Sequence, residues 1–443
     1  MCACVYKMST AAVLLSLVLS LAVSVAVGLD PECGASGWQV PPRPAALTLR
    51  QVNAVIRHGD RTPWGGDLCW PEDSSVWDCQ LTSGQLPMLT DHQYGKVLPR
   101  VYRKIYSFGD ETLRGNCSLS QLTSIGFNQQ KTNGQNLAQA YVDGTFLSKT
   151  MDPTQLYLRS DDIPRTLMSA ESLMLGMYPP DKPATFTQTL EIHTMDPTYD
   201  YMVANPMLCP RTGYYSNTFN QSQAWMDHHP TTLALLEDIY KTTGYNLTED
   251  NLIHYTDCLR THYCHKLELP HGMTMELYQR AWAEVSWQFY NLYQYPSVGE
   301  NSRTGIGFLL KELGENMNAT VNGKKMPKFL LYSGHDTTLM PLLTAMLVDD
   351  GVWSPYASMI LMELYENTTA TPQPLSAIDR FSMRLIYNGK VVSPVFCKLP
   401  GGLCHFKDIS DYLNTVIPPD DYTKLCSVSS QSRRTFGKLL WNF

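Results

Sequence analysis

The sequence predicts an α/β protein in which helices flank a mostly parallel central sheet and an inserted cap domain is mainly helical. Three apolar runs are each followed by a polar loop and then by a helix-like pattern, an order typical of open parallel sheets. Between the second and third runs, apolar and aromatic residues recur at three- and four-residue steps, as on amphipathic helices. A chain of 443 residues is long enough for one such sheet with one large insertion.

The three units are justified in chain order. Residues 47–56 (LTLRQVNAVI) end in an apolar triplet expected of a strand buried on both faces, and RHGDRTP follows with Gly59 for a tight turn. Residues 155–160 (QLYLRS) precede a helix that has Pro164 in its first turn. Residues 329–332 (FLLY) precede a second apolar-faced helix.

Polar and charged side chains follow each predicted strand at its carboxyl end. In an open parallel sheet these ends meet at one edge, where ligands bind, and the N-termini of the following helices favour anions. A salt bridge at one strand end, or a helix cap by Asp336, would explain each motif taken singly. Their shared position instead predicts one anion-binding crevice formed by Arg57, His58, Arg61, Arg165, His335 and Asp336.

The charge balance limits the class of partner. A net charge of −7 argues against nucleic acid and against a polybasic membrane patch. An anionic substrate therefore needs a local concentration of positive charge, which the arginines of RHGDRTP and of the second unit provide.

We divide the chain into four parts. Residues 1–28 are a signal peptide or N-terminal anchor, 29–175 the first part of the catalytic α/β domain, and 176–325 the mainly helical cap insertion. Residues 326–443 complete the α/β domain and add a disulfide-stapled C-terminal segment.

The N-terminus reads as a targeting segment. Lys7 precedes the uncharged, apolar residues 11–27, which fit a cleaved secretory signal; an uncleaved anchor is the alternative because the run approaches spanning length. Both place the chain in the secretory pathway, as a secreted or lysosomal protein or, if the segment is retained, a Golgi-anchored one. A membrane contact is expected only in that last case.

Cysteines and glycosylation sequons agree with an oxidising compartment. Ten cysteines follow the apolar segment, an even number that predicts disulfides. Glycan acceptors are predicted at Asn116, Asn220, Asn246, Asn318 and Asn367. The cysteines are Cys33, Cys69, Cys79, Cys117, Cys209, Cys258, Cys264, Cys397, Cys404 and Cys426.

One cluster of possible metal ligands lies within HYTDCLRTHYCHK. It contains His254, Cys258, His262, Cys264 and His265. Structural zinc sites favour short Cys-x₂₋₄-Cys hooks, whereas these cysteines are six residues apart in a chain expected to be oxidised. We therefore expect a local disulfide with surface histidines, and no metal.

RHGDRTP, RTLMSA and YSGHDTT together resemble the histidine acid phosphatases of the prostatic and lysosomal type. The similarity extends over residues 52–426 and includes ELYE and VIPPDDYTKLC. The stretches CWPEDSSVWDCQ and NCSLSQLTSIG also resemble the phosphoxylose phosphatase branch. The resemblance implies the phosphoglycerate-mutase-like histidine phosphatase fold, an acid phosphatase activity on phosphate monoesters and no cofactor.

The same resemblance implies roles for the six crevice residues. His58 takes the position of the nucleophile, whose ring nitrogen forms a phosphohistidine, and flanking arginines lower its proton affinity. Asp336 takes the position of the proton donor to the leaving alcohol. Arg57, Arg61, Arg165 and His335 take the phosphate-binding positions, for which forked guanidinium groups are well suited. We read Asp60 as a turn residue or one that orients the arginines.

Disulfide pairing is inferred partly from the resemblance. It implies Cys209–Cys426 and Cys397–Cys404, whereas Met359 stands where prostatic-type relatives have a cysteine bridged to the Cys264 region. Cys258–Cys264 is the replacement that we expect, Cys69–Cys79 is a local pair, and Cys33–Cys117 follows by subtraction.

Three alternatives stay open. A phosphosugar (phosphoxylose) or inositol-phosphate phosphatase would use the same core residues under a different cap. Phosphoglycerate mutases share the RHG opening, but the secretory context argues against them. Outside enzymes, the chain would be a secreted anion-binding glycoprotein on this scaffold. The expected substrate is a phosphomonoester or phosphorylated sugar or peptide, and a homodimer is possible because such relatives often dimerise.

Overall fold

The computed structural model describes residues 33–64, 69–79, 90–91, 96–97, 113–179, 189–297, 299–369, 376–417 and 422–428. The apolar segment expected to be a signal or anchor lies outside these residues. Within the described ranges, no helix is both long and apolar enough to cross a membrane.

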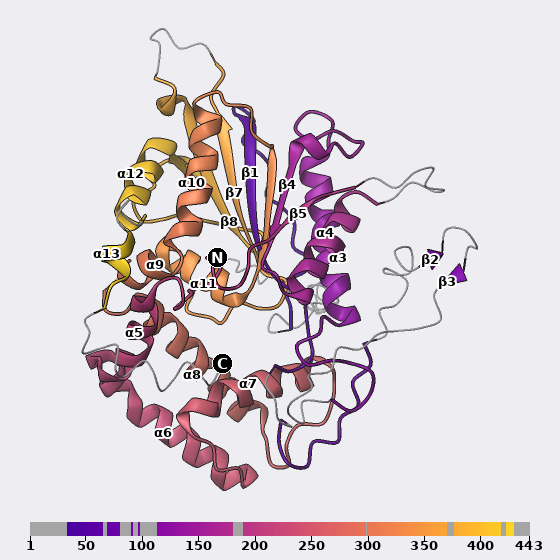
Figure 1. Ribbon diagram of the computed structural model, residues 1–443, viewed down its shortest axis with the longest axis vertical. Coiled ribbons are helices and arrows are strands. Elements are labelled where there is room, and N and C mark those ends of the chain that lie inside the picture. The colour runs from indigo at the N-terminus through magenta and orange to yellow at the C-terminus, as the bar shows by residue number, and fades with distance from the viewer. Residues whose placement is uncertain are drawn as a thin grey trace, which may run out of the picture.

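An eight-stranded mixed sheet forms the centre of the molecule (Figure 1). The strands β1, β6, β4 and β5 run parallel, whereas β7, β8 and β10 continue the sheet antiparallel from β1, and β9 pairs with β8. Their bounds, in sheet order, are β10 Leu403–His405, β8 Phe381–Tyr387, β7 Met359–Glu366, β1 Thr48–Arg57, β6 Phe329–Gly334, β4 Leu156–Ser160 and β5 Ile192–His193, with β9 at Lys390–Val392. A separate two-stranded ladder pairs β2 (Thr90–Asp91) with β3 (Lys96–Val97).

The predicted α/β class is confirmed, but the sheet is mixed rather than mostly parallel. All three strands expected from the sequence lie in the parallel half. The antiparallel half differs because β8 follows β7 with no α-helix described between them, and a parallel pair needs a long crossover connection.

Helices cover both faces of the sheet. On one face lie α3 (Ser124–Tyr141) and α4 (Pro164–Met177), and on the other α10 (Gly307–Val321), α11 (Asp336–Ala345) and α12 (Phe406–Val416) (Figure 1). Strand β1 is buried between them: Ala54 and Ile56 belong to the core cluster of α3 and α4, whereas Val55 belongs to that of α10 and α11. This two-sided burial explains its continuous apolar run.

A second group of helices lies beyond the carboxyl ends of the parallel strands (Figure 1). It comprises α5 (Pro210–Thr218), α6 (Gln223–Thr243), α7 (Glu249–Cys264) and α8 (Met275–Gln294). Their apolar stripes form a core of their own, in which Tyr278 and Trp282 of α8 pack against Leu259 of α7. The aromatic stripe is therefore core, as expected from its spacing.

The predicted insertion, 176–325, is wider than this helical group. Within that range α9 (Glu300–Gly305) leads into α10, and Leu309 and Leu313 of α10 belong to the core cluster of the sheet. The division of the chain into domains stays a prediction. The short C-terminal helix α13 (Tyr422–Cys426) contacts α5.

Five disulfides join the ten cysteines. Cys209–Cys426 and Cys397–Cys404 are paired as the resemblance implied. The other three expected pairs are wrong. Instead of Cys258–Cys264, Cys69–Cys79 and Cys33–Cys117, the structure has Cys33–Cys264, Cys69–Cys258 and Cys79–Cys117.

Secondary structure explains the differences. Cys258 and Cys264 lie on one helix, α7, where six residues separate the Cα atoms by about 9 Å and turn the side chains to different faces. A disulfide requires Cα atoms within about 7 Å. Cys79 faces Cys117 because Trp77 forms a parallel bridge with Gly115 two residues earlier on each segment.

The five sequon asparagines lie in described segments. Asn220, Asn246 and Asn318 are exposed, whereas Asn116 and Asn367 are half-buried. The side-chain amide of Asn116 donates to Asp78 at 2.7 Å, so a glycan there would replace that hydrogen bond. Glycosylation stays a prediction at all five.

Candidate active site

The six crevice residues meet at the carboxyl ends of β1, β4 and β6. Arg57 ends β1 and His58 follows it, while His335 caps α11 directly after β6 and Arg165 lies in the first turn of α4 after β4. The rings of His58 and His335 have centroids 5.4 Å apart. Segments far apart in the sequence therefore bring both histidines to one place.

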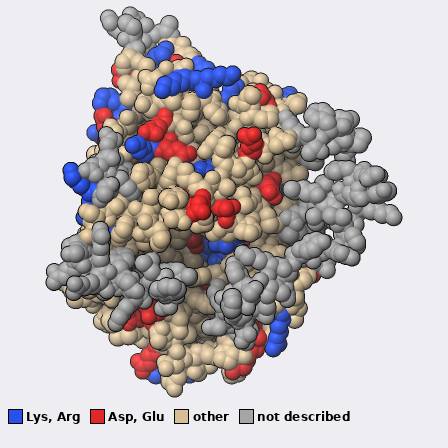
Figure 2. Space-filling view, in the orientation of Figure 1, with Lys and Arg blue, Asp and Glu red and all other residues tan. Residues whose placement is uncertain are grey.

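Figure 2 shows a hollow near the middle of one face, with Lys or Arg atoms at its floor. Acidic side chains lie above it on the same face. The local charge of the hollow is thus opposite to the net charge of −7 of the chain.

The loop after β1 is held rigidly. The amide of His58 donates to the carbonyl of Gly334 at 2.9 Å, and the amide of Gly59 donates to Oγ of Ser169 at 3.1 Å. A Cβ on Gly59 would lie 2.2 Å from the carbonyl oxygen of Gly126 in α3, so only glycine fits this approach.

His58 is oriented and kept neutral by its surroundings. Its Nδ1 lies 2.7 Å from the carbonyl oxygen of Gly59, which can only accept, so Nδ1 carries the proton and Nε2 keeps a lone pair. Burial lowers the pKa of His58 well below its ordinary value, and the charges of Arg165 and Arg57 lower it further. Nε2 is therefore a free base even in acid solution.

Arg57, which is fully buried, and Asp336, which is partly buried, form an ion pair. Nη2 of Arg57 lies 2.8 Å from Oδ2 of Asp336, and the indole Nε1 of Trp353 donates to the same oxygen at 2.6 Å. Burial alone would raise the pKa of Asp336, but Arg57 and Trp353 outweigh it and hold that pKa below its usual range. Burial lowers the pKa of Arg57 to about 10, which still leaves it cationic.

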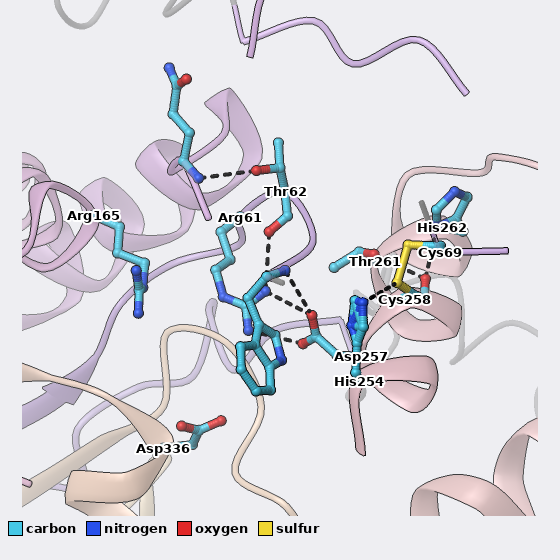
Figure 3. A network of polar contacts seen from close by, with 12 residues as sticks. Arg61, Thr62, Cys69, Arg165, His254, Asp257, Cys258, Thr261, His262 and Asp336 are labelled. Atoms are coloured by element: carbon cyan, nitrogen blue, oxygen red, sulfur yellow. Dashed lines mark hydrogen bonds and ion pairs between the residues drawn. A yellow bond between two sulfur atoms is a disulfide. The ribbon is translucent and has the colours of Figure 1, made fainter. Parts of the chain in front are cut away.

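Arg61 is bound by a helix of the second group (Figure 3). Its Nη1 and Nη2 donate to Oδ2 and Oδ1 of Asp257 in α7, both at 2.9 Å, and Oδ2 also accepts the backbone N–H of Trp64 at 3.3 Å. Burial opposes the charge of Arg61, but this bidentate pair outweighs burial and raises its pKa.

Arg165 and His335 share the other side of the site. Nη2 of Arg165 lies 3.4 Å from Nδ1 of His335, whose Nε2 lies 2.7 Å from Oδ2 of Asp161. Burial and Arg165 lower the pKa of His335, and burial lowers that of Arg165 to about 10. His335 therefore donates from Nε2 to the Asp161 carboxylate.

Tyr356 forms a buried aromatic surface under the guanidinium groups. The central carbons of Arg57 and Arg61 lie 4.4 and 5.6 Å from its ring centroid. The Nε atoms of Arg57, Arg61 and Arg165 are buried and have no hydrogen-bond partner among the residues that the structure describes. Buried donors of this kind are costly unless a ligand accepts from them.

Comparison with known proteins identifies the family. The description "Histidine phosphatase superfamily (branch 2)" matches residues 48–388. The chain belongs to this family. Its residues 48–388 include the whole sheet except β9 and β10, and they contain all six crevice residues.

Relatives match over most of their length. Rat lysosomal acid phosphatase is 30% identical over 407 residues, covering 89% of this chain and 84% of the relative. Counting factor 60 of Dictyostelium discoideum is 28% identical over 394 residues, covering 87% and 90%. Mouse prostatic acid phosphatase is 27% identical over 400 residues, covering 88% and 92%.

Solved structures share the fold. The phytase of Citrobacter braakii aligns with a TM-score of 0.55 at 14% identity, covering 86% of this chain and all of that one. A multiple inositol polyphosphate phosphatase of Bifidobacterium longum aligns with a TM-score of 0.54 at 13% identity, covering 90% and 100%. The histidine phosphatase fold expected from the sequence is confirmed.

Four residues beside the predicted site of this family member escaped sequence reasoning. Asp161 stands directly after β4, where the strand-end rule that selected Arg165 could have found it. Asp257, Trp353 and Tyr356 carry no such signal, because they come from α7 and from a loop without a motif.

Of the two roles expected for Asp60, orienting the arginines is not the one that its contacts support. Its Oδ1 lies 2.6 Å from Nε2 of His265 and accepts from Oγ1 of Thr123. Asp60 therefore links the RHGDRTP loop to the segment after α7. Asp257 has the role toward Arg61 that the sequence assigned to Asp60.

The residues of the cysteine–histidine cluster make separate contacts with other parts of the chain. Cys258 and Cys264 are in disulfides, His262 lies 3.2 Å from Asp73, and His265 pairs with Asp60. Cys69, Asp73 and His262 offer ligand atoms within 4.8 Å of one another, but the Cys69 sulfur is bonded to Cys258. A thiolate ligand would require that disulfide to be reduced.

Proposed function

We propose that this protein hydrolyses phosphate monoesters through a phosphohistidine on His58. The observation that carries the proposal is a neutral imidazole, with its Nε2 lone pair free, beside three arginines whose buried Nε donors have no described partner. A phosphate dianion would accept from those donors and bring phosphorus to the nucleophile. Such preorganised donors are each worth on the order of 3 kcal/mol in a transition state.

The proposed reaction has two displacements. Nε2 of His58 forms a bond to phosphorus while the bond from phosphorus to the ester oxygen breaks, and Asp336 gives its proton to the departing alcohol. Water then attacks the phosphohistidine, the Asp336 carboxylate takes its proton, and phosphate leaves with His58 restored. Arg57, Arg61 and Arg165 hold the non-bridging oxygens throughout. His335 joins them when Nδ1 is also protonated, because its Nε2–H donates to Asp161.

Asp336 must be protonated for the first displacement, yet Arg57 and Trp353 keep it ionised in the unliganded protein. A bound phosphate dianion would engage Arg57 and add negative charge beside the carboxylate, and both effects raise the pKa of Asp336. Substrate binding would therefore favour the protonated form of Asp336. An acid pH favours the same step.

We propose the substrate and the compartment as classes. Five disulfides and the lysosomal acid phosphatase relatives support a location in the secretory pathway. We propose a secreted or lysosomal enzyme, with Golgi anchoring as the outcome if residues 11–27 are retained. The N-terminal residue of the purified protein decides between them. A small phosphomonoester is the proposed substrate class, and a homodimer stays a prediction.

A phosphomonoester panel tests the proposal. Wild type, His58→Ala and the exposed-histidine control His271→Ala are assayed from acid to neutral pH on p-nitrophenyl phosphate, phosphoxylose and inositol phosphates. We expect hydrolysis by wild type and control and none by His58→Ala. Equal rates in all three would contradict the role of His58. No hydrolysis by the wild type would contradict the proposal as a whole and favour an anion-binding glycoprotein.

A further inference from the structure

Asp257 of α7 controls how Arg61 can meet a phosphate. The carboxylate holds both Nη atoms of Arg61 at 2.9 Å and is itself fully buried. Nη1 also donates to the carbonyl of Thr62 at 3.1 Å, so the N–H groups left on Arg61 are the second one of Nη2 and that of Nε, and Nε is buried with no hydrogen-bond partner in the described part of the chain. An arginine free to rotate would offer a phosphate its two-pronged Nη edge instead.

The helix that carries Asp257 is fastened to the catalytic side by two disulfides. Cys258, the next residue, is bonded to Cys69, which follows the RHGDRTP loop by a few positions. Cys264, at the end of α7, is bonded to Cys33. Each disulfide lies one residue from an ion pair to the loop, Asp257–Arg61 in the first case and His265–Asp60 in the second.

The backbone adds a third restraint. The amide of Trp64 donates to Oδ2 of Asp257, so the carboxylate contacts the RHGDRTP loop through both a side chain and the main chain. A rigid carboxylate is what fixes a guanidinium in one orientation, because a bidentate pair specifies geometry as well as charge.

We infer that Asp257 is a positioning residue that fixes Arg61 so that its Nε edge, and not its Nη1–Nη2 edge, faces the transferring phosphoryl group. The inference rests on the proposed phosphatase activity. Asp257 contacts no reacting atom and acts through Arg61. Helix α7 thereby supplies part of the geometry of a site whose three arginines lie at or just after the ends of β1 and β4.

The inference predicts that removing the Asp257 charge lowers turnover without weakening phosphate binding. Removing the Asp257 charge leaves the surroundings of a bound dianion more positive and frees the Nη atoms to bind it, so affinity for phosphate is not weakened. The fixed geometry is lost, and misplacing a group by about 1 Å can cost about 100-fold in rate. A merely structural role would instead weaken both together.

Asp257→Asn tests this against a matched control. Asp73→Asn also removes a buried carboxylate that pairs with α7, through His262 at 3.2 Å, but it does not touch a catalytic arginine. We expect Asp257→Asn to lower kcat by about 100-fold with an undiminished inhibition by inorganic phosphate, while Asp73→Asn leaves kcat unchanged. Equal kcat in the two variants, or parallel loss of kcat and phosphate inhibition in Asp257→Asn, would overturn the inference.

A crystal structure of the wild type with tungstate needs no variant. We expect Asp257 to keep both Nη atoms of Arg61, with a tungstate oxygen accepting from Nε. An Arg61 that leaves Asp257 to give both Nη atoms to the anion would overturn the inference. Because this readout needs no turnover, it stays decisive if Asp257→Asn does not fold or if the proposed activity fails in the assay.

Discussion

Trp353 sets the acidity of the proposed proton donor, and Trp353→Phe should change it measurably. Oδ2 of Asp336 accepts from Nε1 of Trp353 at 2.6 Å and lies 2.8 Å from Nη2 of Arg57, while Oδ1 accepts from the amide of Thr337. Phenylalanine keeps an aromatic ring but removes the indole donor. Only the carboxylate form of Asp336 loses stabilisation, so its pKa rises.

The size of the shift follows from the hydrogen bond that is lost. A hydrogen bond to a charged group contributes about 1.5–3 kcal/mol. One pKa unit corresponds to about 1.4 kcal/mol, so the pKa of Asp336 should rise by about 1–2 units. Asp336 then stays protonated to higher pH, and the alkaline limb of the kcat–pH profile shifts to higher pH by the same amount.

The assay is the pH profile of kcat on an alkyl phosphate, whose alcohol needs the proton. Trp282→Phe is the control, because Trp282 stacks on Trp353 with centroids 4.8 Å apart and its loss disturbs the same packing without removing that hydrogen bond. The position of the limb does not depend on the folded fraction, which changes only the amplitude. An unmoved alkaline limb in Trp353→Phe, or an equal shift in Trp282→Phe, would refute the reasoning.

Three further outcomes are expected. Asp336→Asn should slow hydrolysis of alkyl phosphates far more than of p-nitrophenyl phosphate, whose leaving group needs no proton, and equal losses on both would remove Asp336 from the donor role. The acid limb of kcat/KM should lie well below pH 6.5, because burial, Arg165 and Arg57 lower the pKa of His58; loss of kcat/KM around pH 6.5 itself would contradict a nucleophile kept neutral in this way. Glu363→Gln should lower the free energy of unfolding by about 3–5 kcal/mol, because the buried Arg384 loses its counter-charge. In thermal melting, the control Asp411→Asn, which removes an exposed ion pair, should melt like the wild type, whereas equal melting of Glu363→Gln and the wild type would contradict this reasoning.

Local patterns predicted the half of the fold that carries the crevice. Strands β1, β4 and β6 are short apolar runs that end at polar loops, and their parallel pairing follows from the helices between them. Strand β7 was missed because its run MILMELYE contains Glu363, a buried carboxylate. The hydrogen-bond partners of Glu363, Tyr141 and Arg384, lie 222 and 21 residues away, and no local sequence pattern predicts them.

The same distinction separates the site residues that were found from those that were missed. Arg57, His58, Arg165, His335 and Asp336 are placed by strand ends, a local feature. Asp257 reaches Arg61 from 196 residues away, through a helix that packs by its own core. The prediction of a Cys258–Cys264 disulfide failed for a related reason, because spacing in sequence did not show that the two cysteines occupy different faces of α7.

The central claim is that His58 carries the phosphoryl group during turnover. The most direct measurement is mass spectrometry of peptides from a reaction quenched during steady-state turnover under conditions that preserve phosphohistidine. We predict one phosphoryl group on the peptide that contains His58, absent in His58→Ala and located on Nε2. Continued turnover with no phosphoryl group on that ring, or with the group on another residue, would contradict the account.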